Sequence, residues 1–198
     1  MRLSRPLTAG AALIALATLT GCGGDGDGQL DSGFGSQPNG KGESGGKSLP
    51  KAKDVAAMER FVNQYTVCKD LETDATLGRY SETASEFEDL PKGAEAGVKE
   101  RAYCEAERGQ PIALLTISDM KKFLQAAKAN EDAGKDTAAM VGADFAVVPT
   151  DGDTLRALKP SGLLVASCNA DFNRKIPSGY LKREGTVDGC VLTDYLPS

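Results

Sequence analysis

Five cysteines in a chain of 198 residues without a single histidine are the strongest constraint on fold and chemistry. One of them, Cys22, lies near the N-terminus, and the others are Cys68, Cys104, Cys168 and Cys190. No Cys-x-x-Cys spacing occurs, so the exchange motif of thioredoxin-like proteins and the close pairs of a zinc knuckle are both missing. Histidine, the commonest metal ligand and general base near neutral pH, is also lacking. The last four cysteines are therefore predicted to be structural.

Residues 1–21 have the organisation of an export signal. Arg2 and Arg5 form a basic start, and an apolar run over residues 7–19 follows. This run is shorter than the roughly 20 residues needed to span a bilayer, but it suits the core of a signal peptide. Cleavage after the small-x-small sequence Ala15-Leu16-Ala17 would release a secreted protein, and this alternative stays open.

The apolar run ends in Leu19-Thr20-Gly21-Cys22, which resembles a bacterial lipobox. The resemblance implies cleavage before Cys22 and transfer of a diacylglyceryl group to its thiol. Two acyl chains hold a protein stably in a membrane, whereas one does so only marginally. We therefore expect a lipoprotein whose membrane partner is bound through the diacylglyceryl group at Cys22, on the extracytoplasmic face of the cell membrane.

Residues 22–52 are predicted to be a disordered tether. The stretch 23–50 is rich in Gly, Ser, Asp, Asn and Lys, so it buries too little apolar surface to offset its ordering entropy. A flexible chain of this length spans roughly 30 Å.

Two stretches of the tether imitate ligand-binding motifs. A P-loop ending at Ser48 lacks its first glycine, since Lys41 stands there, and a calcium loop starting at Asp25 lacks both its turn glycine and its closing glutamate. No cofactor or metal is therefore predicted.

With Cys22 lipidated, an even number of cysteines remains in the exported domain, which predicts two disulfides. Three pairings are possible. We favour Cys68–Cys104 with Cys168–Cys190, because each pair then joins neighbours within one half of the domain. In the chain-entropy model each bridge adds about 3–4 kcal/mol to stability.

Residues 53–198 are predicted to form one α+β domain with a mixed, mostly antiparallel sheet and helices packed on one side. Two strand–helix–strand passages, over residues 112–148 and 144–168, suggest parallel βαβ units. The stretch 95–107 is ambiguous, because its alternation favours a strand while a helix is a serious competitor. The expected helices cover 55–70, 119–130 and a short segment ending at 158, with a possible helix at 81–87 and a turn at 137–140. The expected strands cover 98–107, 112–117, 144–148, 163–168, 180–183 and 189–195. The first two are predicted to form a hairpin around a turn at 107–110, the last two form a closing hairpin, and residues 169–179 are expected to be a loop.

The composition lowers the expectation of an enzyme and of a nucleic-acid partner. The net charge is −5, and no basic stripe is present to follow a phosphate backbone. The candidate acids have ordinary roles: Asp151 or Asp153 is expected to cap a helix, and Ser118 to cap another. The acidic residues Glu86, Glu88 and Asp89 are expected to form a solvated face. The tyrosines at strand positions, Tyr103, Tyr180 and Tyr195, are candidates for a binding surface but more often pack in a core or at a sheet edge.

Together with the lipobox, three segments look like small uncharacterised lipoproteins of high-GC Gram-positive bacteria. They are Ser118-Asp119-Met120-Lys121-Lys122-Phe123, Asp144-Phe145-Ala146-Val147-Val148-Pro149 and Cys190-Val191-Leu192-Thr193-Asp194-Tyr195. This resemblance carries no activity. Our leading hypothesis is a non-enzymatic binding or interaction module for an extracellular protein, glycan or small ligand. The alternatives are an extracellular or cell-wall hydrolase that uses paired carboxylates, and a structural envelope protein.

Overall fold

The computed structural model describes residues 48–73, 87–135 and 139–196. The chain divides into two units, residues 1–42 and 43–198, and every described residue belongs to the second. The expected signal peptide, Cys22, nearly all of the tether and most of the possible helix at 81–87 lie outside the described residues.

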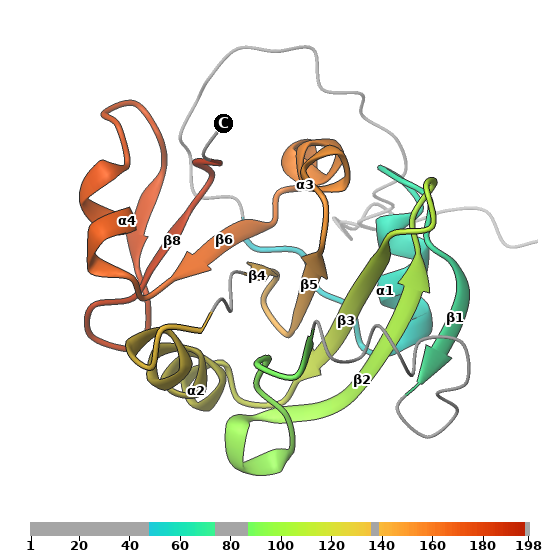
Figure 1. Ribbon diagram of the computed structural model, residues 1–198, viewed down its shortest axis with the longest axis horizontal. Helices are drawn as coiled ribbons and strands as arrows, with labels where there is room; N and C mark the ends of the chain where they lie inside the picture. Colours follow the sequence, from blue (N-terminus) through green and yellow to red (C-terminus); the bar gives the residue numbers. More distant parts are fainter. Residues whose placement is uncertain (1–47, 74–86, 136–138, 197–198) are drawn as a thin grey trace, which may run out of the picture. The chain divides into compact units, whose positions relative to one another are not determined.

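One eight-stranded sheet organises the described part of the chain, in the order β1-β2-β3-β5-β4-β6-β8-β7 (Figure 1). The strands are β1 (Lys69–Thr73), β2 (Val98–Glu105), β3 (Pro111–Ile117), β4 (Ala139–Val141), β5 (Phe145–Pro149), β6 (Leu164–Ser167), β7 (Lys182–Glu184) and β8 (Val191–Thr193). The helices are α1 (Val55–Val62), α2 (Met120–Asp132), α3 (Gly152–Leu158) and α4 (Ala170–Lys175), with short 3₁₀ turns at Ala94–Ala96 and Lys159–Ser161.

The α+β fold class is confirmed, and every neighbouring pair of strands in the sheet is antiparallel. The expectation of parallel βαβ units is therefore wrong for strands that are neighbours in the sheet. β3 and β4 both pair with β5, so they run in the same direction with β5 between them. In the same way β5 and β6 are separated by β4. The crossover from β3 through α2 to β4 therefore skips β5, and the crossover from β5 through α3 to β6 skips β4. The two strands of the β4–β5 hairpin occupy the skipped positions.

Helices cover both faces of the sheet, whereas the sequence suggested one side. On one face, Phe123 and Leu124 of α2 pack into a buried cluster with Leu115. On the other, Met58 of α1 and Leu158 of α3 pack into a second cluster. The two crossovers explain this arrangement. The strands from which they start, β3 and β5, are antiparallel, and both crossovers lead in the same direction along the sheet. Two such crossovers of the same handedness must lie on opposite faces of the sheet.

Helix α1 is much shorter than the predicted helix over 55–70. Its start is as expected, because Asp54 accepts a hydrogen bond from the Ala57 N–H at 2.7 Å. Its end is set by Asn63, whose side chain donates to the Cys68 carbonyl at 2.8 Å and accepts from the Cys68 N–H at 2.9 Å. This exchange folds the chain into a turn. Cys68 therefore leads into β1 and does not lie on a helix.

The ambiguous stretch 95–107 forms strand β2, so the helical alternative is wrong for most of it. β2 pairs with β3 along its whole length, and Tyr103, Cys104 and Ala102 are buried. The register shifts between Val98 and Glu100. A bulge of this kind inserts one extra residue into a strand. It explains why the polar Glu100 interrupts the alternation of an otherwise regular strand.

Other differences involve short elements. Residues 139 and 140 of the helical turn expected at 137–140 belong to strand β4, all of whose residues are buried, while residues 137 and 138 lie outside the described residues. The region 169–179, expected to be a loop, contains α4, which begins at an Asn169 side chain that accepts from two backbone N–H groups. Asp119, one residue after Ser118, is the cap of α2. A single turn of helix and a three-residue strand are both too short to give a clear period in the sequence.

Both disulfides have the favoured pairing. Cys68–Cys104 joins residues 36 apart and belongs to the core cluster under α1, and Cys168–Cys190 joins residues 22 apart and belongs to the cluster under α2. Each face of the sheet therefore holds one bridge. All four of these cysteines are buried, with an exposed fraction of 4% or less.

Replacing either pair of bridged cysteines by serines is expected to lower the free energy of unfolding by about 3 kcal/mol, with a slightly larger loss for the longer Cys68–Cys104 loop. Urea unfolding of the two double variants beside the wild type measures this. A loss within about 0.5 kcal/mol, as for an ordinary surface substitution, would contradict a structural role for that bridge.

Candidate functional site

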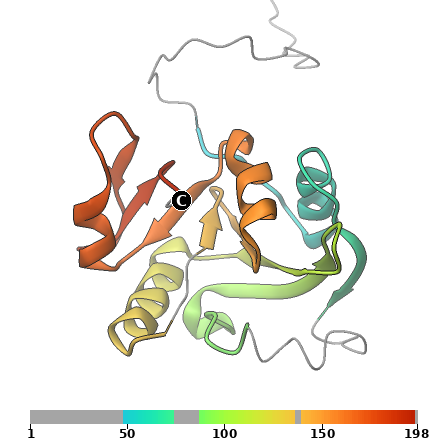
Figure 2. The ribbon, with the colours of Figure 1, turned by 45° about the horizontal axis from the view of Figure 1, so that its top comes forward.

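An open groove of about 530 Å³ lies where three segments meet. They are the turn that follows α1, the turn between β2 and β3, and the first residues of α3, which lie side by side in both views of the ribbon (Figures 1 and 2). The volume falls within the range of roughly 300–1,000 Å³ that is usual for ligand sites. The lining residues are Asn63, Gln64, Tyr65, Thr66, Val67, Ala106, Glu107, Arg108, Gln110, Asp151, Asp153, Thr154 and Ala157.

The wall after α1 is held in place by the exchange of hydrogen bonds between Asn63 and Cys68. Because Cys68 is also bonded to Cys104 of β2, this wall is fixed to the sheet. Gln64 is exposed, while Tyr65 is half-buried and its ring packs on Phe61, with ring centroids 5.5 Å apart. The wall therefore presents its polar side chains from a rigid support.

The second wall is the turn between β2 and β3. The Ala106 N–H donates to the Gln110 carbonyl at 2.7 Å, and Gly109 supplies the positive φ of 76° that closes the turn. Glu107 and Arg108 are thereby placed in solvent at the tip of the turn. At the base, the Thr150 hydroxyl donates to the Pro111 carbonyl at 3.0 Å, which ties this hairpin to the segment that precedes α3.

Asp151 shapes the third wall by capping α3. One of its oxygens accepts from the backbone N–H groups of Asp153 and Thr154, both at 2.9 Å. Burial acts to raise the pKa of Asp151, but these bonds, the Thr154 side chain and the charge of Arg108 together hold it below its ordinary 3.8. Its other oxygen is buried, with no hydrogen-bond partner among the described residues. Asp151 is thus a carboxylate at neutral pH.

Asp153 lies between two guanidinium groups. It accepts from Arg108 across the groove at 2.8 Å and from Arg156 on its own helix at 2.7 Å. The side chains are largely exposed, at 81% for Arg108 and 56% for Asp153. Exposed pairs of this kind contribute at most about 1 kcal/mol. The Arg108–Asp153 contact is therefore weak enough for a ligand to replace.

The lining is mainly polar. It combines three carboxylates with one guanidinium, and adds side-chain amides, hydroxyls and a tyrosine ring. The side-chain charges of the lining residues sum to −2, which disfavours the binding of polyanions. Such a lining offers many hydrogen-bond donors and acceptors beside a comparable area of apolar surface. It fits a polar ligand better than a lipid or an apolar peptide side chain.

The structure brings together only some of the residues considered from the sequence. Asp151 and Asp153 share the groove, with Asp151 as the cap. Ser118 is elsewhere and donates to the Gly97 carbonyl at 3.1 Å. Tyr103 is buried in the core beside Phe87.

Sequence reasoning did not find the remaining groove residues, Gln64, Arg108 and Gln110 among them. The one available signal was that Glu107 and Arg108 are charged residues at a predicted hairpin turn. Nothing in the sequence indicated that this turn lies beside Gln64.

Among the described residues, no group of three or more Cys, Asp or Glu side chains is placed to hold a metal ion, and no helix has the length and apolar character to cross a membrane. No protein-family model, curated protein or solved structure matches the chain.

Asp151→Ala is expected to destabilise the protein by about 1 kcal/mol, because it removes the cap of α3. Asp151→Asn keeps a capping oxygen but removes the charge. Since the folded-state pKa lies below 3.8, the contribution of this charge is complete above the unfolded pKa and is lost as the pH falls through the lowered value.

Urea unfolding of the wild type and the two variants between about pH 6 and pH 3 measures both effects. Asp151→Asn is expected to lose less stability on acidification than the wild type. Identical pH profiles for the wild type and Asp151→Asn would show that the carboxylate is not stabilised by its surroundings.

Proposed function

We propose that the protein is a membrane-anchored extracytoplasmic lipoprotein that acts as a non-enzymatic binding module, with the groove as its binding site. The lipobox-like sequence ending at Cys22 supports the anchor. The two buried disulfides fit an oxidising environment outside the cytoplasm. They also account for every cysteine except Cys22, whose thiol remains for the lipid.

The observation that carries the binding function is the polar groove on a rigid support. A hydroxyl group both donates and accepts hydrogen bonds, so a ligand rich in hydroxyls needs donors and acceptors side by side. Arg108 and the amides of Gln64 and Gln110 supply donors, and the carboxylates supply acceptors. The Tyr65 ring adds an apolar surface with a polar edge. A glycan without negative charge has the matching chemistry, and we take it as the ligand class.

Hydrolysis by paired carboxylates is the second candidate, because Asp151 and Asp153 line the same groove. That reaction needs one carboxyl group with a raised pKa, so that it holds a proton near neutral pH. The pKa of Asp151 is lowered, and Asp153 is held between two guanidinium groups. These features favour binding over hydrolysis.

Cys22→Ser is expected to move the protein from the detergent-rich phase to the aqueous phase when cell extracts are partitioned, because the lipid acceptor is lost. Ser48→Ala in the tether is the matched control and should leave the partitioning unchanged. Intact-mass analysis of the wild type is expected to show a chain that begins at a diacylglyceryl-modified Cys22. A chain that begins at Thr18 would instead establish secretion as a soluble protein.

A panel of uncharged oligosaccharides tested by calorimetry is expected to contain a ligand for the wild type. The double variant Gln64→Ala, Gln110→Ala is expected to weaken that binding at least about fivefold, because each lost hydrogen bond contributes about 0.5–1.5 kcal/mol. Gln125→Ala, an exposed glutamine on α2, is the control and should bind as the wild type does. If no sugar binds, or if the double variant binds equally well, the groove is not a glycan site, and a structural role in the envelope gains support.

A further inference from the structure

The loop between α4 and β7 joins an apolar tip to basic flanks. The loop itself is the tip Ile176-Pro177-Ser178-Gly179-Tyr180-Leu181. Two basic residues precede it at the end of α4, Arg174 and Lys175, and two follow it at the start of β7, Lys182 and Arg183. Tyr180 is 40% exposed. Among the described residues the only other exposed large hydrophobic side chain is Val67, at the groove. The loop that carries Tyr180 lies at the opposite end of the sheet from α1 (Figure 1).

The charge of this segment is opposite to that of the chain. Residues 171–184 contain four basic and two acidic side chains, a balance of +2, in a chain of net charge −5. Arg174 forms an ion pair with Asp171. Lys175 is exposed and makes no ion pair within the described residues, and the same holds for the half-buried Arg183. Positive charge therefore remains available on both flanks of the tip.

Tyr180 belongs to a group of aromatic rings with a lysine beside it. Its ring meets that of Tyr195 edge to face, with centroids 5.0 Å apart, and Tyr195 in turn lies 5.9 Å from Phe172. The ammonium group of Lys159 lies 5.8 Å from the centre of the Tyr180 ring. Tyrosine and lysine side by side are the combination that proteins place at the level of lipid headgroups, where one end of each side chain is apolar and the other is polar.

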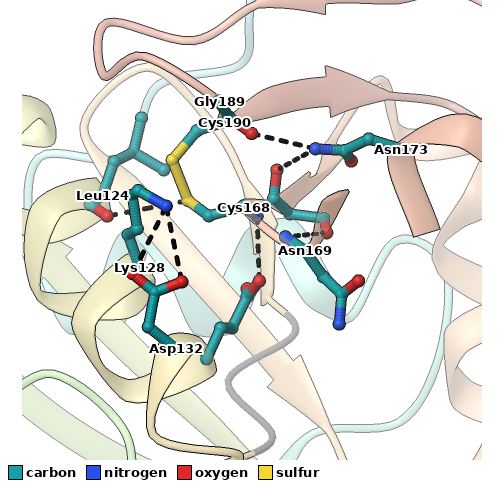
Figure 3. A network of polar contacts seen from close by, with 10 residues as sticks. Leu124, Lys128, Asp132, Cys168, Asn169, Asn173, Gly189 and Cys190 are labelled. Carbon is teal, nitrogen blue, oxygen red and sulfur yellow. Dashed lines mark hydrogen bonds and ion pairs between the residues drawn. A yellow bond between two sulfur atoms is a disulfide. The ribbon is translucent and has the colours of Figure 1, made fainter. Parts of the chain in front are cut away.

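The base of the loop is rigid. The amide of Asn173 donates to the Gly189 carbonyl at 2.9 Å, next to the Cys168–Cys190 disulfide (Figure 3). The Lys182 ammonium donates to the Asn173 carbonyl at 2.8 Å. The same disulfide is joined to α2, because the Cys168 N–H donates to a Glu131 carboxylate oxygen at 3.0 Å. A loop held in this way loses little conformational freedom when it meets a surface.

We propose that the α4–β7 loop docks on an anionic lipid surface. Tyr180 enters the headgroup layer, and Lys175 and Arg183 approach the lipid phosphates. Each basic side chain near such a surface strengthens binding about fivefold, and the attraction is screened by salt. The contact is therefore weak, reversible and sensitive to ionic strength. It does not depend on Cys22, since the lipid anchor would fix the chain to a membrane but not the orientation of the domain.

The test uses the absence of tryptophan from the chain. Tyr180→Trp in the full-length protein introduces a single fluorescent reporter at the tip, and Tyr65→Trp places the same reporter at the groove. With vesicles that contain phosphatidylglycerol, the emission of the tip reporter is expected to shift to shorter wavelength and to be quenched by brominated lipids. The groove reporter is expected to show neither change, so a failure of the lipid anchor or of sugar binding leaves this comparison intact.

Charge is tested in the Tyr180→Trp background with Cys22→Ser added, so that the lipid anchor does not hold the protein on the vesicles. Lys175→Gln with Arg183→Gln is expected to weaken vesicle binding roughly 30-fold. Lys121→Gln with Lys122→Gln, two exposed lysines on α2, is the control and is expected to leave it unchanged. The proposal is overturned if the tip reporter ignores anionic vesicles, or if it responds equally to purely zwitterionic ones. It is also overturned if only an acidic polypeptide such as polyglutamate shifts the emission, because the loop would then be a docking site for an acidic protein.

Discussion

Burial of both faces of β3 is the constraint on which the rest of the structure depends. All seven of its residues are buried, and the aliphatic ones from Ile112 to Ile117 alternate between the two core clusters, with Leu115 on one face and Leu114 on the other. A strand that is apolar on both sides must be covered on both sides. Helix α2 covers one face and helices α1 and α3 the other, and the core cluster on each face contains one disulfide.

The same strand shows how far the sequence could predict the fold. The run 112–117 is almost uniformly apolar, so a strand was predicted, and its neighbour over 98–107 showed enough alternation to predict the hairpin. Both disulfide pairs and helix α2 followed from similarly local signals. The order of the strands could not be predicted, because no local feature of the sequence distinguishes a crossover between neighbouring parallel strands from one that skips a strand. The three residues of β4 were the element that decided it, and they are too few to show a period.

The groove was harder to predict than the fold, for a physical reason. Its walls come from residues near 65, 108 and 153, and each wall is a turn or a helix end. Such segments follow no hydrophobic period, and their proximity is a product of the sheet order. Asp151 illustrates the difference. Its role as a helix cap was predicted from its neighbours, but its lowered pKa also depends on Arg108, which the β2–β3 turn places nearby.

The position of one disulfide on each face has a consequence for how the cysteines find their partners. Cys104 and Cys168 belong to clusters on opposite faces, so an incorrect bridge between them would have to pass through the layer of strands. Once β2, β3 and β5 have paired, the sheet acts as a partition between the two pairs of thiols. Oxidation in one half of the domain can then proceed in any order relative to the other, without a step that rearranges mismatched bridges.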